Sequence, residues 1–184
     1  IVKFDIFYGK EPTDCIEWAS KKTRGEFGMG LALEFGVAGG RTLDIISKDH
    51  HAVGFDSFEG LPEDWRDGFP KGMFAGPVPA IQNAEVVVGW FEDTLPKWIT
   101  LNRDRLSNLE LIHVDCDLYS STVTVLENLK PWIKSGLYIV FDEYHGYPGY
   151  ENHEARAWEN FVEENEISVA LRGIGPEQLV VEIL

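Results

Sequence analysis

The sequence predicts an α/β fold, a Rossmann-like, doubly wound sheet of seven mostly parallel strands. Short, nearly continuous apolar runs recur along the 184 residues, as strands buried on both faces of a parallel sheet do. Segments with helical periodicity separate several of these runs. A glycine-rich turn follows the first run and leads into one such segment. Together these three features favour alternating β and α units.

Seven apolar runs have the length and composition of strands. They span residues 30–35, 52–56, 84–90, 109–115, 137–142, 167–172 and 178–184. Only residues 173–177 separate the last two runs, which is too short for the helical crossover that parallel neighbours require. We therefore expect these two strands to form an antiparallel hairpin at one edge of the sheet.

Three segments between the strands have a helical pattern. In residues 120–134 the apolar side chains recur at three- and four-residue steps, and Gly136 follows as a C-terminal cap would. Residues 152–165 repeat the pattern, and residues 42–48 form a short helix after the first strand. These helices supply the layers that a doubly wound sheet needs.

The length fits one domain over residues 1–184, which can bury a substantial core without disulfides. Residues 1–29 precede the first strand and form an N-terminal cap segment. Within it, the amphipathic residues 14–22 either supply a small lid helix or pack on the sheet. Residues 60–83 are irregular and rich in Gly and Pro, which predicts a lid or inserted loop.

The net charge of −15 opposes binding to phosphate backbones and anionic lipid, so we expect neither nucleic acid nor a membrane as partner. No apolar run approaches the ~20 residues that cross a bilayer, and the opening residues lack the pattern of a signal peptide. Cys15 and Cys116 form no C-x-x-C pair and predict neither a zinc cluster nor a disulfide framework. These features favour a cytoplasmic protein.

The glycine-rich turn LEFGVAGGRT predicts a ligand site. Gly36 allows a tight turn after the first strand, and Gly39 and Gly40 let the backbone approach a ligand closely. The spacing is G-x-x-G-G and not the dinucleotide pattern G-x-G-x-x-G, which weakens a nicotinamide interpretation.

An acid at the end of the second strand extends this site. Asp56 stands where an acidic residue in such folds accepts hydrogen bonds from ribose hydroxyls, with Ser57 beside it; the alternative is that Asp56 only caps the turn at Ser57. The third strand ends at Gly89 and Trp90, close to the expected position of an adenine ring. Trp90 either stacks on that ring or belongs to the core. Turn and acid together favour an adenosine-containing ligand.

Carboxylates gather where the fourth and fifth strands end, in LIHVDCDLYSS and YIVFDEY. Asp115, Asp142 and Glu143 are the predicted trio, with Asp117 in reserve. Three carboxylates in contact repel one another unless a cation compensates them, and Mg²⁺ is the hard divalent ion that prefers oxygen ligands. The alternative is that Asp115 caps the following turn and the other two are ordinary loop acids.

Other polar residues have weaker signals. His145 and His153 follow the fifth strand and are candidates for a general base or a substrate contact, although surface histidines are common. His113 lies inside a buried strand and is predicted to be a hydrogen-bonded core histidine. No base can be paired with Cys116 from sequence, so we interpret it as a packing residue.

The ordered set LEFGVAGGRT, VGFDSFEGLPEDW, GWFEDTLP, HVDCDLYSS and FDEY resembles the macrocin O-methyltransferase family of class I methyltransferases. The similarity extends from about Leu33 to about Glu154. It implies the class I methyltransferase fold, S-adenosylmethionine as the methyl donor, and Mg²⁺-dependent transfer to a hydroxyl of a sugar or related small molecule. In that chemistry the cation lowers the pKa of the hydroxyl and holds its oxygen in line with the sulfonium methyl.

The resemblance also implies residue roles. Glu34 and Gly36 would line the methionine end of the cofactor, Asp56 would hold the ribose, and Asp115 would bind metal and help to deprotonate the acceptor. The family usually has two aspartates where this chain has the metal-binding pair Asp142–Glu143. Little sequence precedes the first strand, which argues against macrolide-sized acceptors. A homodimer is an open expectation.

Two other classes of function stay open at this point. A nicotinamide-dependent oxidoreductase on a similar fold would need the G-x-G-x-x-G spacing, which the sequence does not have, and a Tyr/Lys or His proton donor, which cannot be identified from the sequence. A non-catalytic nucleoside-binding module would keep the pocket without turnover, and the intact carboxylate cluster speaks against it.

Overall fold

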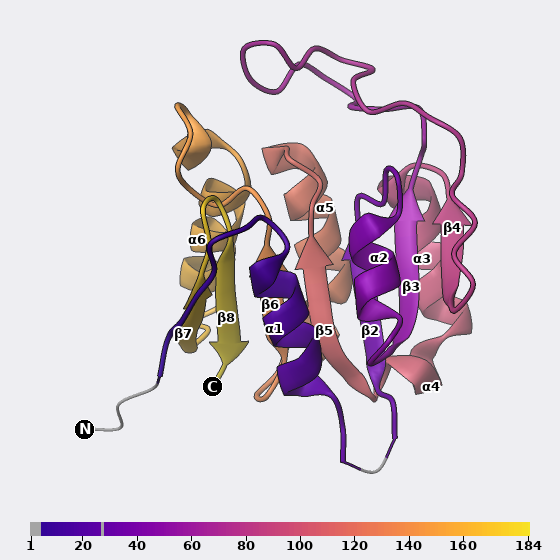
Figure 1. Ribbon diagram of the computed structural model, residues 1–184, viewed down its shortest axis with the longest axis vertical. Coiled ribbons are helices and arrows are strands. Elements are labelled where there is room, and N and C mark those ends of the chain that lie inside the picture. Colours follow the sequence, from indigo (N-terminus) through magenta and orange to yellow (C-terminus); the bar gives the residue numbers. More distant parts are fainter. Residues whose placement is uncertain (1–4, 27) are drawn as a thin grey trace.

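The computed structural model describes residues 5–26 and 28–184 and confirms the predicted α/β fold (Figure 1). One eight-stranded sheet has the order β1-β7-β8-β6-β5-β2-β3-β4. All seven predicted strands are present, and a two-residue β1, too short for a sequence pattern, is added at the edge. The strands are β1 (Phe7–Tyr8), β2 (Leu31–Phe35), β3 (His51–Asp56), β4 (Ala84–Val88), β5 (Leu109–Val114), β6 (Tyr138–Phe141), β7 (Val169–Ile174) and β8 (Leu179–Ile183).

The strand directions create a crevice at one edge of the sheet. β8 runs antiparallel to both β6 and β7, which confirms the predicted hairpin, while all other neighbours are parallel. β2 lies between β3 and β5, so the chain builds outward first on one side of β2 and then on the other. Ligands of open α/β sheets bind at the carboxyl ends of the strands where the order reverses in this way.

Helices cover both faces of the sheet (Figure 1). One face carries α1 (Asp14–Thr23) and α2 (Arg41–Ile46), and the other carries α3 (Phe91–Leu101), α5 (Tyr119–Leu129) and α6 (Glu154–Glu164). The remaining helical turns are α4 (Arg103–Leu106), η1 (Lys130–Trp132) and η2 (Tyr150–Asn152). None of the helices in the described ranges is long and apolar enough to span a membrane.

Two helices differ from the sequence prediction. The helix predicted over residues 120–134 ends at Leu129 and tightens into η1, because Pro131 has no N–H to donate. Gly136, expected as its cap, lies in the turn before β6 and donates its N–H to the Ile183 carbonyl. α3 was not predicted, since Pro96 interrupts its sequence pattern.

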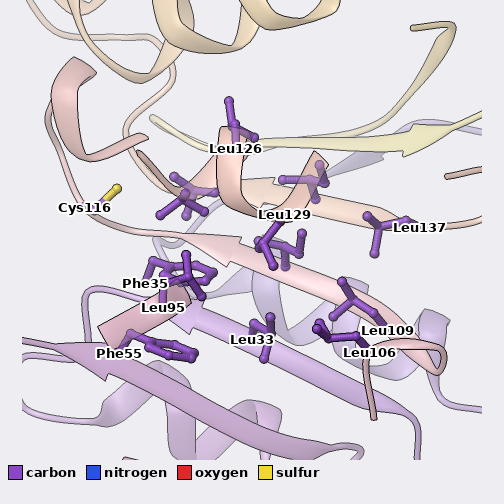
Figure 2. Close-up of a cluster of buried hydrophobic side chains, with 14 of the residues drawn as sticks. Leu33, Phe35, Phe55, Leu95, Leu106, Leu109, Cys116, Leu126, Leu129 and Leu137 are labelled. Carbon is purple, nitrogen blue, oxygen red and sulfur yellow. The ribbon is translucent and has the colours of Figure 1, made fainter. Parts of the chain in front are cut away.

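The alternation of side chains along β2 divides the core into two layers. Leu33 and Phe35 point toward α3 and α5, where they pack with Phe55 and Leu126 (Figure 2). Leu31 belongs to the same cluster. The next residue on the opposite face, Ala32, packs in a second cluster against α1 and α2. Each fully buried Leu or Phe contributes about 1.5–3 kcal/mol to folding, so both layers hold the strand ends in place.

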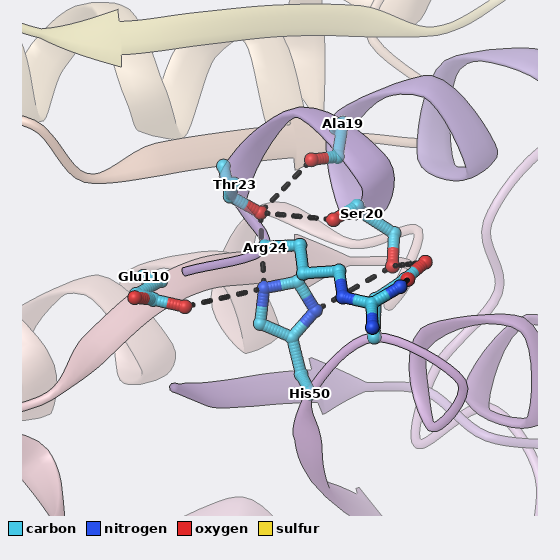
Figure 3. A network of polar contacts seen from close by, with 7 residues as sticks. Ala19, Ser20, Thr23, Arg24, His50 and Glu110 are labelled. Atoms are coloured by element: carbon cyan, nitrogen blue, oxygen red, sulfur yellow. Dashed lines mark hydrogen bonds and ion pairs between the residues drawn. The ribbon is translucent and has the colours of Figure 1, made fainter. Parts of the chain in front are cut away.

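A polar network fixes α1 near the amino ends of the strands (Figure 3). The buried His50 lies with Nε2 3.0 Å from Thr23 Oγ1 and 3.5 Å from Glu110 Oε2, and Arg24 pairs with Asp49 at 3.4 Å. Burial lowers the pKa of His50, with Asp49 opposing that shift. α1 therefore packs on the sheet and is not a lid helix. Residues 1–4 and 27 of the predicted cap segment lie outside the described residues.

The predicted insert between β3 and β4 contains no helix or strand and extends beyond the carboxyl edge of the sheet (Figure 1). It is nevertheless anchored. Trp65 is buried beside Tyr147, and the Arg66 guanidinium lies 4.0 Å from the Trp65 ring and 3.2 Å from Glu177 in the β7–β8 turn. Its role as a lid stays a prediction.

Candidate functional site

A cleft of about 520 Å³ opens at the carboxyl edge, where β2, β3 and β5 end. Its walls come from the glycine turn, the ends of three strands, the insert and the start of α5. The lining residues are Gly36, Ala38, Asp56, Ser57, Gly60, Leu61, Pro62, Phe74, Trp90, Phe91, Glu92, Asp115, Cys116, Asp117, Ser120, Ser121, Thr124 and Glu143. The cleft thus joins the predicted nucleoside side to the predicted carboxylates.

The glycine turn needs its glycines at two of the three predicted positions. Gly36 has φ +94°, and a Cβ there would collide with the carbonyl of Asp115, so β2 and β5 approach this closely only with glycine. Gly40 has φ +79° at the start of α2, and its Cβ would lie 2.7 Å from Ile81 Cδ1. A Cβ on Gly39 would meet nothing within 4 Å, so neither the backbone angle nor space requires glycine there.

Asp56 clamps this turn from the end of β3. Its Oδ2 accepts hydrogen bonds from the N–H groups of Val37 and Ala38, both at 2.8 Å. Its Oδ1 accepts one from Phe58 N–H at 2.8 Å, which caps the turn at Ser57 as the alternative interpretation expected. The carboxylate also lines the cleft, as Ser57 does, so capping and ligand contact are compatible.

The third strand brings one aromatic residue to the cleft. Trp90 precedes α3, lines the cleft and is not among the buried core residues. Gly89 has φ +138° and donates its N–H to the Asp56 carbonyl at 2.9 Å, but does not line the cleft itself. Trp90 is therefore available to a planar ring, whereas Gly89 shapes the backbone behind it.

A buried charged group lies behind the cleft, on the α1 side of the sheet. His113 Nδ1 is 2.8 Å from Glu34 Oε2, and His113 Nε2 is 3.6 Å from Asp142 Oδ1. Burial disfavours the imidazolium, but the contacts with Asp142 and Glu34 together raise the pKa of His113 well above its usual value. This set, which we call the buried triad, confirms His113 as a hydrogen-bonded core histidine.

The buried triad changes the expected place of Glu34. Its side chain is fully buried and does not line the cleft. Burial raises the pKa of Glu34, and the hydrogen bond with His113 opposes that shift. Direct contact with the methionine end of a cofactor is thus not available to Glu34 in this geometry.

Asp115, Asp117 and Glu143 form a second acidic group, which we call the open cluster. Each offers a carboxylate oxygen within 4.8 Å of the others. Burial, followed by the charge of Asp142, raises the pKa of Asp115 well above its usual value, and burial raises that of Asp117 to about 7. The pKa of Glu143 is raised well above normal by burial and by the charges of Asp115 and Asp117. Carboxyl oxygens at this spacing fit a hard divalent cation.

The open cluster differs from the predicted trio in one member. The structure brings Asp115 and Glu143 together as expected, but it adds Asp117 where Asp142 was predicted. Asp142 instead faces His113, whose positive charge holds it. Asp117 has φ +64°, a left-handed conformation uncommon for a non-glycine residue, and sits in the loop that brings it to the cluster.

Glu154 is a buried acid that the sequence analysis missed. It begins α6, and its carboxylate accepts hydrogen bonds from the N–H groups of Cys116, Asp117 and Glu143, all at 3.2 Å. Burial, with the charge of Asp117, raises its pKa to about 8. In sequence, Glu154 does not differ from the exposed acids of the same helix, so no local signal identifies it.

Of the remaining candidates, the two histidines lie outside the cleft, and Cys116 is a buried residue in its wall. His145 Nε2 is 3.2 Å from the Gln178 carbonyl in the β7–β8 turn, and neither His145 nor His153 lines the cleft. Cys116 is buried with Sγ 3.5 Å from Thr122 Oγ1, and burial raises its thiol pKa well above normal. The structure therefore does not bring the predicted base His145 to the candidate site.

Comparisons with known proteins give a family match. Residues 78–178 match the family model described as macrocin-O-methyltransferase (TylF). Two Streptomyces enzymes align over 110 residues: a tetracenomycin-C rhamnosyl 4'-O-methyltransferase of S. olivaceus at 32% identity and demethyldecarbamoylnovobiocin O-methyltransferase of S. niveus at 30%. Each alignment covers 48% of this chain and only 40% of the relative.

Solved structures share the fold. The calicheamicin methyltransferase CalS11 superposes with a TM-score of 0.72 at 23% identity, covering 91% of this chain and 77% of that one. The O-methyltransferase NovP gives 0.70 at 22%, covering 92% and 78%. An O-methyltransferase from Bacillus cereus in complex with SAH gives 0.57 at 14%, covering 95% and 81%. These likenesses confirm the class I methyltransferase fold.

Proposed function

This chain belongs to the macrocin-O-methyltransferase (TylF) family, and on that premise we propose that it transfers the methyl group of S-adenosylmethionine to a hydroxyl of a sugar or related small molecule. One observation carries the proposal: a single cleft joins the clamped glycine turn to the open cluster. The printed names of the two Streptomyces relatives, a rhamnosyl 4'-O-methyltransferase and a novobiocin O-methyltransferase, support a sugar-related acceptor.

The nucleoside of the cofactor is proposed to bind beside Gly36, Asp56 and Trp90. A carboxylate offers about four acceptor positions, and backbone N–H groups use three of those on Asp56. The remaining position can accept a ribose hydroxyl without disturbing the turn. Trp90 supplies a ring face for the adenine, and Ser57 a hydroxyl at the same wall.

The open cluster is the proposed Mg²⁺ site. Asp115, Asp117 and Glu143 fit the ion because they offer three oxygens within 4.8 Å of one another. Burial, and after it the charges of neighbouring acids, raises their pKa values, and a cation would relieve that repulsion. When bound, the ion would lower the pKa of the acceptor hydroxyl and orient its oxygen. Asp142 could become a ligand of the ion only if its side chain turned away from His113.

The transfer step needs a proton acceptor in the cleft. The acceptor oxygen forms a bond to the methyl carbon while the carbon–sulfur bond breaks, and S-adenosylhomocysteine leaves as a neutral thioether. The hydroxyl proton passes to a carboxylate oxygen of Asp115 or Asp117, the acids nearest the end of β5 in the cleft lining. Most of the catalytic help then comes from alignment of the oxygen, carbon and sulfur atoms.

The charge of the cleft favours a neutral acceptor. Five acids line it, and Lys, Arg and His are absent from the lining among the residues that the structure describes. These acids are Asp56, Glu92, Asp115, Asp117 and Glu143. A phosphate group on the acceptor would enter a negative field without a basic partner, so we propose an uncharged glycoside or polyol.

Calorimetry with S-adenosylmethionine, S-adenosylhomocysteine and NAD tests the cofactor class. We expect both sulfur nucleosides to bind and NAD to give no heat. Binding of NAD alone would instead support the oxidoreductase alternative. An assay of methyl transfer to glycosides, with Mg²⁺ or with chelator, tests turnover, and nucleoside binding without any transfer would support the binding-module alternative. The homodimer stays a prediction, to be measured by light scattering.

A further inference from the structure

Three backbone N–H groups converge on the buried carboxylate of Glu154. One oxygen, Oε1, accepts from Cys116 and Asp117, and the other, Oε2, accepts from Glu143. The side chain is 0% exposed and does not line the cleft. Glu154 therefore cannot itself contact a substrate there, and its role must act through the loops that it holds.

Two of these N–H groups, those of Cys116 and Glu143, come directly after the last that the sheet pairs, and that of Asp117 is the next along its loop. The ladder between β2 and β5 ends with Asp115 N–H bonded to the Phe35 carbonyl, and the ladder between β5 and β6 ends with Asp142 N–H bonded to the Val114 carbonyl. The next residues along each loop turn away from the sheet. Glu154 takes over at this point, with one carboxylate oxygen for each loop.

The two loops held in this way carry the open cluster. Asp117 follows β5 and Glu143 follows β6, and no strand pairing fixes their separation beyond the sheet edge. A left-handed conformation such as that of Asp117 costs of order 1–3 kcal/mol and persists only where neighbouring contacts enforce it. The bond from Asp117 N–H to Glu154 is such a contact.

We propose that Glu154 is a positioning residue that sets the spacing of the Asp117 and Glu143 carboxylates for a divalent cation. This inference rests on the metal site of the proposed function. It requires both side-chain oxygens as acceptors, because each loop uses a different one; the carboxylate form supplies both, and a bound cation would favour that form. A glutamine at this position keeps the shape but turns one acceptor into an N–H donor, which cannot bond to a backbone N–H.

The test compares wild type, Glu154→Gln and the control Glu159→Gln. Glu159 lies on the same helix, is exposed, and accepts a hydrogen bond from the Tyr144 hydroxyl at 3.5 Å. Titration with Mn²⁺, followed by its electron paramagnetic resonance signal, should show about 10-fold or greater loss of affinity in Glu154→Gln and none in the control. Affinity for S-adenosylhomocysteine should change less than about twofold. Unchanged Mn²⁺ affinity in folded Glu154→Gln would overturn the inference.

Amide hydrogen exchange separates this inference from the metal site itself. In metal-free wild type, the N–H groups of Cys116, Asp117 and Glu143 should exchange slowly, and in Glu154→Gln at least that of Glu143 should lose protection. Fast exchange in wild type would overturn the inference even if the variant failed to fold. Wild type that binds no Mn²⁺ would refute the metal site and with it the role of Glu154, whereas nucleoside binding would still test the cofactor class.

Discussion

Two acidic groups lie at the same edge of the sheet and differ in how their charge is balanced. In the buried triad, Glu34 and Asp142 face the imidazolium of His113. In the open cluster, no member forms an ion pair within 4 Å with a basic residue of the described chain, and Asp115 carries a strongly raised pKa. The fold therefore supplies a cation to one group, and we propose that the other binds one from solution.

The largest expected effect concerns the open cluster. Asp115→Asn should lower kcat/KM for methyl transfer by about 10³-fold, or about 4 kcal/mol, because it removes a metal ligand and a proton acceptor together. Affinity for S-adenosylhomocysteine, measured by calorimetry, should stay within a few-fold of wild type. Transfer at the wild-type rate would show that the open cluster is not part of the active site.

The matching change in the buried triad should act on stability. His113→Leu leaves Glu34 buried without its partner, and we expect a loss of about 3 kcal/mol in the free energy of unfolding by urea. The double variant Glu34→Leu/His113→Leu should recover part of this loss, since both charges are then gone. If the single variant were as stable as wild type, the imidazolium would not be the compensating charge.

Two further variants test which aspartate, Asp117 or Asp142, belongs to the proposed metal site. Asp117→Asn should weaken Mn²⁺ binding about tenfold, or about 1.4 kcal/mol, whereas Asp142→Asn should change it less than about twofold. Titration of both variants under the same conditions decides between them. The reverse order would restore the predicted trio of Asp115, Asp142 and Glu143.

The smallest expected effect is a pH dependence of stability. Asp117 and Glu154 have pKa values of about 7 and about 8 in the fold, above their values in an unfolded chain. Their protonation therefore stabilises the metal-free fold at low pH; this stabilisation falls as pH rises from about 4, where these groups ionise in the unfolded chain, and is gone above about 8. In EDTA, Tm should fall by several degrees between pH 5.5 and 8.5, and Mg²⁺ should restore much of it at pH 8.5. A flat profile would argue against clustered acids.

The sequence predicted those features that depend on strand ends. Gly36, Asp56 and Asp115 each follow or close a strand, so the order of strands alone brings them to one cleft. α3 was not predicted because Pro96 interrupts its helical sequence pattern, although the helix itself accommodates this proline. Strand order thus predicts which residues lie at the carboxyl edge of the sheet.

Side-chain direction and long-range contacts could not be predicted in the same way. Asp117 takes the place of Asp142 in the open cluster because its own backbone is left-handed and because Asp142 faces the charge of His113. Neither feature produces a periodic pattern in the sequence. Glu154 accepts hydrogen bonds from residues 37 and 38 positions earlier in the sequence, and only the tertiary fold brings that loop to it. His145 follows the expected strand, but the turn directs it toward Gln178.

Anomalous diffraction from crystals grown with S-adenosylhomocysteine and Mn²⁺ tests the central contrast most directly. We expect one manganese peak among Asp115, Asp117 and Glu143, with the nucleoside beside Gly36 and Asp56. Density for the nucleoside without manganese in the open cluster, or manganese bound by Glu34 and Asp142 in place of the imidazolium, would contradict the account.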